Sequence, residues 1–526
     1  MKFKKIISLM LCLVLSALVF GGCGSEDAYV LYFELDSPPK TLDPQLASGP
    51  SEELLIKNLF EGLMRENSKG EVVKGAASNY TVSADKKTYT FTLRDGAKWS
   101  DEVPLTGKDF VFAFERAIDP KNQAPYAPAL YSIVGAKDIA EGKKSGGLGV
   151  SSPKDDTVII NLNSPDPNFL RTLTTSICTP CRKDIYNKSK GQYGLVPERI
   201  VTNGSYKIRF WEKEGKFSFR INKFAEYNGD FVAEATAVIF NVGNIADRTA
   251  KIDEGNLDMG FVNISDASEN LQLFTYEKSS YVLLINKNSP LGSKEFRTAF
   301  AKSIHRNRLK NELGKSLKES PCLIPNTVLL NGTPLSDKIT VTVPPEYEPN
   351  EAYSLYISGT KSVKDMPKKI DILYFGEAEP KELSLMIAEN MQQSLGAVVN
   401  AMPTQSNEEL TTKVANGDFT LAILPITATS NTPQHFFETF TKNSGNNIYG
   451  FENKKYDEEV SKIKPDSNEA TVTSAAEKAL KTLISDISII PLAMHLEGFG
   501  YSKEFTCPTV SPFGGVIDLA LVRKSK

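Results

Sequence analysis

The chain has 526 residues, and its 61 lysines and arginines nearly balance its 64 aspartates and glutamates, which gives a formal net charge of −3. The charges nearly balance, and the sequence has no basic stripe with interleaved aromatic residues. Nothing in it therefore indicates nucleic-acid binding. The length is enough for two or three domains with substantial cores.

The first 23 residues have the layout of an export signal. Lysines near the start are followed by an apolar run from Ile6 to Phe20, and then by Gly-Gly-Cys. The run is shorter than the roughly twenty residues that a membrane-spanning helix needs, so a transmembrane anchor is the weaker interpretation. The FGGC sequence resembles a bacterial lipobox, which implies that Cys23 is lipidated and that residues 1–23 form a lipoprotein signal with its modified cysteine. The mature protein is then expected on the outer face of the cytoplasmic membrane, on the extracellular or periplasmic side, held by acyl chains.

The first elements of the mature chain are a helix and a strand. The helix is predicted to be capped by Ser51, with leucines recurring every four residues on one face: Leu55, Leu59 and Leu63. The segment KTYTFTLR alternates apolar with polar residues and predicts a half-buried strand that ends at the turn Asp95-Gly96.

Next come a capped helix and a hairpin. Thr106 and Asp109 lie three residues apart in TGKDFVFAFERAI, so they are expected to cap the start of a helix. The stretch SYKIRFWEKEGKFSFRIN predicts two strands joined by a turn at Glu214-Gly215. One face is expected to hold these residues: Tyr206, Ile208, Phe210, Phe217, Phe219 and Ile221.

The second half of the chain continues the alternation of helices and strands. A helical stripe is predicted from Phe296 through Phe300 to Ile304, and residues 381–402 predict a helix followed by a short strand. Residues 321–350 are proline-rich and unpatterned, which predicts a surface excursion. The fold class is therefore α/β with some antiparallel sheet.

A stretch near the C-terminal end, LAILPITATSNTPQHFF at 421–437, contains no lysine, arginine or carboxylate. The first four residues predict a buried strand that ends at Pro425, because proline cannot donate to a central ladder. The polar, uncharged residues that follow need another explanation, such as the wall of a binding site.

Motifs of enzyme chemistry are weak or missing. The sequence has no GxxxxGK[ST], no GxSxG and no strand-linked GxGxxG, and SSPK at 151–154 lacks the KTG element that accompanies SxxK in penicillin-binding enzymes. The histidines His305, His435 and His495 are scattered and form no HExxH pair. No catalytic residue, metal or cofactor is predicted, and the protein is not expected to be an enzyme.

Four cysteines remain in the chain after the lipobox: Cys178, Cys181, Cys322 and Cys507. An exported protein could oxidise them. The CTPC sequence at 178–181 leaves three interpretations open, namely a redox motif, a local disulfide or two ordinary thiols.

Several segments, in the same order over nearly the whole mature chain, resemble the oligopeptide and dipeptide class of solute-binding proteins of ABC importers. They are LDPQ at 42–45, NLFEGLMREN from Asn58, TYTFTLRDGAKWSD from Thr88, LTGKDFVFAFERAIDP from Leu105, IVTNGSYKI from Ile200, EYNG at 226–229 and IIPLAMH at 489–495. The resemblance implies a two-lobe periplasmic-binding-protein-like α/β fold with an extra inserted α/β domain. Lobe I would comprise 24–60, 186–278 and 495–526, the inserted domain 61–185, and lobe II 279–494.

The resemblance also implies where a ligand binds. In this family, the segment corresponding to 419–433 lines the interlobe cleft and offers main-chain groups to an extended peptide, as a strand would. Many members hold the peptide amino group with an aspartate at the position of Thr429, and the threonine here means either that another carboxylate enters the cleft or that the amine is not the anchor. The full set of expected ligand-binding residues is Ser48, Gly49, Tyr126, Leu424, Pro425, Ile426, Thr427, Thr429, Asn431 and His495.

The implied function is that of a lipid-anchored, monomeric receptor that captures a peptide or a related small solute. Its partners would be an ABC permease with its ATPase subunits, and the membrane through the lipid anchor. The alternative is a lipoprotein that kept the fold but works as a peptide sensor or chaperone, or, as the weakest option, as an extracellular hydrolase.

Overall fold

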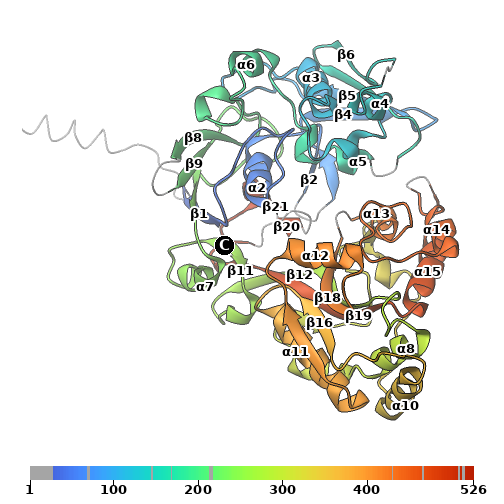
Figure 1. Cartoon of the computed structure of the whole chain (residues 1–526). Coiled ribbons are helices and arrows are strands. Elements are labelled where there is room, and N and C mark those ends of the chain that lie inside the picture. The colour runs from blue at the N-terminus through green and yellow to red at the C-terminus, as the bar shows by residue number, and fades with distance from the viewer. Residues whose placement is uncertain are drawn as a thin grey trace, which may run out of the picture.

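The computed structural model describes residues 28–67, 71–143, 146–166, 169–212, 217–428, 431–464, 467–506, 510–511 and 516–525. Figure 1 shows two bodies. The first body contains strands β1 to β11, and the second body contains strands β13 to β18. Two long strands, β12 (Gln272–Ile285) and β19 (Ile489–Tyr501), pair antiparallel with each other and connect the bodies.

One sheet of 11 strands runs through both bodies, in the order β17-β16-β18-β12-β19-β11-β1-β10-β9-β8, with β13 paired to β19. Besides β12 and β19, its strands are β17 (Val399–Pro403), β16 (Ile370–Tyr374), β18 (Leu421–Thr427), β11 (Met259–Val262), β1 (Val30–Leu35), β10 (Ala237–Val242), β9 (Ser218–Lys223), β8 (Tyr206–Glu212) and β13 (Leu317–Glu319).

The first body also carries a four-stranded sheet, in the order β4-β5-β7-β6, formed by β4 (Ala77–Val82), β5 (Thr88–Leu93), β6 (Val150–Lys154) and β7 (Thr157–Asn161). Three two-stranded pairs complete the described strands: β2 (Met64–Glu66) with β3 (Val72–Lys74), β14 (Leu329–Leu330) with β15 (Thr333–Pro334), and β20 (Val510–Ser511) with β21 (Val516–Ile517).

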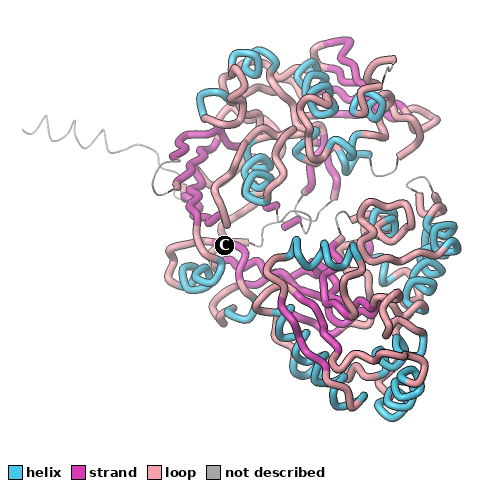
Figure 2. The backbone as a smooth tube through the Cα atoms, in the orientation of Figure 1, coloured by secondary structure: helices cyan, strands magenta, loops and turns pink. Residues whose placement is uncertain are grey.

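Helices surround these sheets, as Figure 2 shows. Those of the first body are α2 (Pro50–Leu59), α3 (Gly107–Ile118), α4 (Ala136–Ala140), α5 (Phe169–Thr172), α6 (Lys183–Lys188) and α7 (Ile245–Asp253). Those of the second body are α8 (Lys294–Lys302), α9 (Arg306–Glu312), α10 (Pro349–Thr360), α11 (Glu379–Leu395), α12 (Asn407–Asn416), α13 (Pro433–Glu438), α14 (Lys454–Val460) and α15 (Glu469–Ser485). Across the described residues, none of the helices combines the length and the apolar character needed to cross a membrane.

The sheet of the second body is buried on both faces. Alternate residues of β12 and β18, such as Leu283 and Ile423, pack with helices α8, α10 and α11. The residues between them, such as Leu284 and Ala422, pack with α12 to α15 on the opposite face. Because successive side chains of a strand point to opposite faces, each strand supplies both cores, which explains the continuous apolar run LAIL.

Several local predictions are confirmed. Strand β5 buries alternate residues, as the pattern KTYTFTLR requires. Helix α3 begins after Thr106, whose backbone N–H donates to the Asp109 carboxylate at 2.9 Å. The segment 381–402 forms α11 and then β17.

The predicted cap at Ser51 is wrong by two positions. Helix α2 begins at Pro50, and Gly49 is its N-cap. Proline suits the first helical position because its fixed φ is helical and its missing N–H would have no partner there. A Cβ at Gly49 would approach the carboxylate of Glu52, so any other residue there would require the Glu52 side chain to shift.

The predicted surface excursion at 321–350 is also wrong. Five of its apolar side chains belong to the core of the second body: Leu323, Ile324, Val328, Leu335 and Ile339. Irregular backbone hides this from a periodicity search, because buried residues without a regular element have no fixed spacing.

The hairpin formed by β8 and β9 departs from simple alternation. Ile208 lies opposite Ile221, but Phe210 lies opposite Arg220, so Arg209 is an extra residue in the ladder. Such a β-bulge reverses the alternation, so the prediction that Phe210 shares a face with Tyr206 is wrong: the Phe210 side chain is 47% exposed, while Tyr206 and Trp211 are buried.

The two connecting strands cross the predicted limits between lobes. The boundaries at 278/279 and 494/495 fall inside β12 and β19, respectively. The ladder between these strands has register shifts between Glu277 and Ser279 and between Tyr281 and Val282. The division into domains stays a prediction.

Candidate functional site

The free side of strand β18 is the first part of the candidate site. On one side, β18 pairs with β12 from Leu421 to Thr427. On the other side, β16 pairs with it only at Leu421 and Ala422, and no further strand of the described chain continues that ladder. The backbone from 423 to 427 is therefore a short sheet edge.

This edge explains why β18 is longer than predicted. Pro425 lies inside the strand, opposite Tyr281, and not after its end. Proline is tolerated on a strand whose neighbouring edge is unpaired, because the missing N–H then breaks no ladder. The prediction of a strand limited to LAIL is wrong for that reason.

The side chains of the predicted wall point in two directions. Leu424 and Ile426 are 3% and 1% exposed and belong to the core, so only their backbone can meet a ligand. Pro425 and Thr427 alternate with them and are exposed. This alternation leaves an apolar ring and a hydroxyl beside the free backbone.

Thr427 and His495 are brought together across the sheet. Both are register partners of Ser279, which lies on β12 between them. Directly opposed residues of neighbouring strands share a face, so these three side chains form a row. The His495 ring also lies against Tyr281, with 5.9 Å between the ring centroids.

The electrostatics of this row favour an uncharged histidine. Burial lowers the pKa of His495, an effect that the nearby carboxylate of Glu379 opposes. Burial also raises the pKa of Tyr281 to about 12, with a contribution from Glu379. The row therefore offers neutral hydrogen-bonding groups. The nearby carboxylate of Glu379, at the start of α11, was not predicted from the sequence.

A second group lies in the first body, at the start of helix α2. The Tyr126 hydroxyl donates to the backbone oxygen of Ser48 at 3.3 Å, so these two predicted residues are in contact. Gly49 follows as the N-cap of α2. Burial raises the pKa of Tyr126, and the carboxylates of Glu53 and Glu52 raise it further.

Glu53 is a site residue that sequence reasoning missed. Its pair with Glu52 has an ordinary explanation, since acidic residues stabilise the first turn of a helix. The structure separates the two: Glu52 accepts from the backbone N–H of Lys40 at 2.6 Å, whereas Glu53 accepts from the Ser176 hydroxyl at 2.8 Å. Burial raises the pKa of Glu53 to about 7, which the sequence could not reveal.

The two groups are not in contact with each other. Within the described residues, no hydrogen bond or ring contact joins Ser48, Gly49 or Tyr126 to the row of Thr427 and His495. Asn431 is near β18, and its backbone oxygen accepts from Leu329 N at 2.7 Å. Thr429, Cys23 and Cys507 lie outside the described residues, so the predictions about them stay predictions.

The CTPC cysteines are free thiols, and they are buried. Burial raises the pKa of Cys178 to about 12 and that of Cys181 to about 11. A thiol with a raised pKa is a poor nucleophile at neutral pH, which argues against the redox interpretation. The described residues contain no group of three or more histidines, cysteines or acids that could hold a metal ion.

Comparisons with known proteins identify relatives that cover most of the chain. Residues 71–448 match the family model for bacterial extracellular solute-binding proteins, family 5 middle. The oligopeptide-binding protein OppA of Bacillus subtilis is 27% identical, over 94% of this chain and 94% of that protein.

Solved structures agree in fold. The pheromone receptor PrgZ, in a structure that describes its mode of peptide binding, is similar with a TM-score of 0.72 and 25% identity, covering 95% of this chain and 100% of that one. The unliganded open form of the murein tripeptide binding protein MppA has a TM-score of 0.73 at 23% identity, with 95% and 98% coverage. The chain therefore has the two-lobe periplasmic-binding-protein fold, and it belongs to the family 5 bacterial extracellular solute-binding proteins.

Proposed function

We propose that this protein is the lipid-anchored substrate-binding component of an ABC importer. It captures a peptide, or a related small solute, between its two bodies and delivers the ligand to a membrane permease and its ATPase subunits. It works as a monomer on the outer face of the cytoplasmic membrane, anchored through Cys23.

The observation that carries the proposal is the free backbone edge of β18 from 423 to 427. An extended peptide can add to such an edge as a further strand, so that main-chain hydrogen bonds supply affinity regardless of sequence. The exposed side chains of Pro425 and Thr427 flank this edge, while Leu424 and Ile426 are anchored in the core and hold it rigid. The OppA relative is named for oligopeptide binding, which fits this mode.

The opposite wall is assigned to Ser48, Gly49 and Tyr126 on the first body. Tyr126 is 43% exposed although its hydroxyl is bonded to Ser48, so the ring face is available for stacking on a ligand. Closure of the two bodies about β12 and β19 would bring this wall onto a peptide held by β18.

A peptide sensor is the second candidate function, and the fold likeness to the pheromone receptor PrgZ favours it over a chaperone or a hydrolase. A sensor and an importer component can share the same binding site. They differ in whether ligand enters the cell through a permease that depends on this protein.

The test is to purify the mature chain, beginning at residue 23, from its native host and identify co-purifying molecules by mass spectrometry. Peptides in defined lengths are expected, and they should rebind to the stripped protein in calorimetry. Uptake of the labelled peptide should fall when the gene is deleted. Binding without any effect on uptake would favour the sensor, and an absence of peptides together with no rebinding would refute peptide capture.

A further inference from the structure

The outer face of the sheet in the first body is an open surface that the proposed ligand site does not use. Its side chains lie in rows that are set by the register of four strands. One row runs from Phe210 on β8 through Arg220 on β9 and Ile239 on β10 to Tyr32 on β1. Phe210 and Tyr32 are 47% and 43% exposed. The opposite face of the same strands is buried, with Phe219 and Phe240 fully covered.

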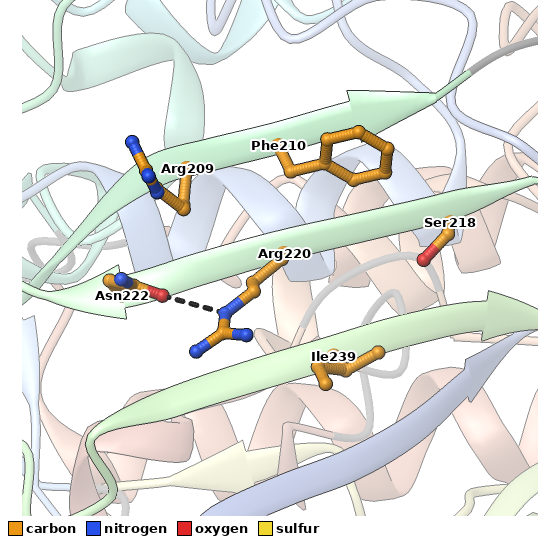
Figure 3. A pocket seen from close by; sticks show the side chains of 6 residues that line it. All are labelled: Arg209, Phe210, Ser218, Arg220, Asn222 and Ile239. Atoms are coloured by element: carbon orange, nitrogen blue, oxygen red, sulfur yellow. Dashed lines mark hydrogen bonds between the residues drawn. The ribbon is translucent and has the colours of Figure 1, made fainter.

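A hollow of about 750 Å³ lies on this face, lined by Arg209, Phe210, Ser218, Arg220, Asn222 and Ile239 (Figure 3). The bulge in β8 brings two consecutive residues to its lining. Because Arg209 is the extra residue of the ladder, Arg209 and Phe210 are both exposed, although they are consecutive in sequence. A regular strand would have buried one of them.

The charge of the hollow is positive. Arg209 and Arg220 form no ion pair with a carboxylate within the described chain, and Arg220 Nε donates only to the amide oxygen of Asn222 at 2.9 Å. The acids at the border of the face include Glu212 at the end of β8, Glu34 on β1, which is engaged by Lys251 at 2.8 Å, and Asp258, whose carboxylate accepts from the backbone N–H of Tyr32 at 2.7 Å. Two guanidinium groups beside an exposed aromatic ring are thus available to an anionic partner.

The expected anchor is joined to the chain close to this face. Val30, the first residue of β1, is in register with Ala237, the first residue of β10. Residues 24–29 separate Cys23 from β1, and even fully extended they reach only about 25 Å. Strand β8 lies three strand spacings from β1, or about 14 Å. An acylated Cys23 would therefore keep the hollow within reach of the lipid headgroups.

We propose that this outer sheet face, centred on Arg209, Phe210 and Arg220, docks on the anionic headgroups of the membrane that holds the anchor. Guanidinium groups bind phosphate with paired hydrogen bonds, and exposed aromatic rings prefer the interface between headgroups and acyl chains. The docking holds the first body against the bilayer and leaves the second body free to close. This inference rests on the proposed anchoring, but not on the identity of the ligand.

The test places a reporter in the hollow. The native tryptophans, Trp99 and Trp211, are buried, so Phe210→Trp adds an exposed one. The acylated chain is reconstituted into vesicles of phosphatidylglycerol and phosphatidylcholine with brominated acyl chains, which quench tryptophan on contact. We expect quenching of Trp emission in F210W, and none in the control Tyr353→Trp, an equally exposed position on α10 of the second body.

The charges are tested in the F210W background. A basic residue near an anionic surface contributes about fivefold to membrane partition, so Arg209→Ala with Arg220→Ala should weaken the docked state about 25-fold. The matched control removes two exposed lysines of the second body, Lys361→Ala with Lys364→Ala, and should change nothing. Vesicles of phosphatidylcholine alone, or high salt, should also abolish the quenching.

Two results would overturn the proposal: no quenching in anchored F210W, or equal quenching after both arginines are removed. Mass spectrometry of the N-terminal peptide shows beforehand whether Cys23 is acylated. If it is not, a histidine tag at the N-terminus and nickel-chelating lipid supply the tether, so that the face is tested independently of the anchor. Peptide binding measured on the same variants should be unchanged, which separates this result from the proposed function.

Discussion

Glu53→Gln is expected to make the protein more stable at alkaline pH. Glu53 lies in the first turn of α2, accepts from the Ser176 hydroxyl at 2.8 Å, and has a pKa raised by burial from 4.5 to about 7. Glutamine keeps the size of the side chain and can still accept from Ser176 through its amide oxygen. The substitution therefore removes the ionisable proton and little else.

The sign follows from proton binding in the two states. In the unfolded chain the carboxyl loses its proton near pH 4.5, whereas in the folded chain it keeps the proton up to about pH 7. Between these values the folded state binds more protons, so the free energy of unfolding falls as pH rises and levels off above pH 7. The cost of ionising the folded-state group is up to about 3 kcal/mol at pH 8, at about 1.4 kcal/mol per unit of pKa.

Urea denaturation at several pH values from 4.5 to 8.5 measures the effect. The variant and the wild type should be similar at pH 4.5, and the variant should become more stable by up to about 3 kcal/mol at pH 8. Glu52→Gln is the matched control for the substitution itself, because Glu52 lies in the same helical turn but accepts from the Lys40 backbone at 2.6 Å and not from Ser176. Parallel pH profiles for wild type and Glu53→Gln would refute the argument that folding raises the pKa of Glu53.

Three further predictions concern anchoring, closure and the amine site. Cys23→Ser should abolish acylation and leave the protein unprocessed or shed, and incorporation of labelled palmitate by the variant would contradict the lipobox interpretation. A cognate peptide should raise the melting temperature and reduce the radius of gyration in X-ray scattering while staying chemically intact, whereas steady release of product would indicate an enzyme. Thr429→Asp should improve binding of a peptide with a free amino terminus relative to its acetylated form, because a carboxylate within about 4 Å of an ammonium stabilises its charged form. Calorimetry with one matched peptide pair measures this, and an unchanged preference would place Thr429 away from the amine.

Local sequence patterns predicted elements well where one interaction fixes the geometry. The pair of Thr106 and Asp109 marks the start of α3, and the alternation in KTYTFTLR marks β5, because capping and burial each act over a few residues. Ordered segments of family resemblance predicted the two-lobe fold, which periodicity alone could not.

Features that depend on a neighbouring strand escaped prediction. The length of β18 depends on β16 ending early beside it, which makes Pro425 acceptable within the strand. The outward position of Phe210 depends on an unpaired residue in the ladder with β9. Strand propensity describes one strand at a time, so it cannot show where a neighbouring strand ends or where a ladder has an unpaired residue.

The candidate site was also predicted only in part. Resemblance identified Ser48, Tyr126, Thr427 and His495 only as separate candidates. The structure brings Ser48 together with Tyr126, and places Thr427 and His495 in one row. Glu53 was missed because an acid in a first helical turn has an ordinary explanation, and only the three-dimensional surroundings show that it is half-buried beside Ser176.

The connection between the two bodies restricts how they can move. Strands β12 and β19 are hydrogen-bonded to each other along most of their length, so they form a ribbon and not two independent tethers. A ribbon bends readily out of its plane but resists bending within it, since in-plane bending would stretch one strand against the other. Its register shifts, between Glu277 and Ser279 and between Tyr281 and Val282, are the points where the ladder is weakest. The two bodies should therefore open by rotation about a single axis beside Ser279. Because the same strand segment contacts Thr427 and His495, the geometry of that row should change as the rotation proceeds.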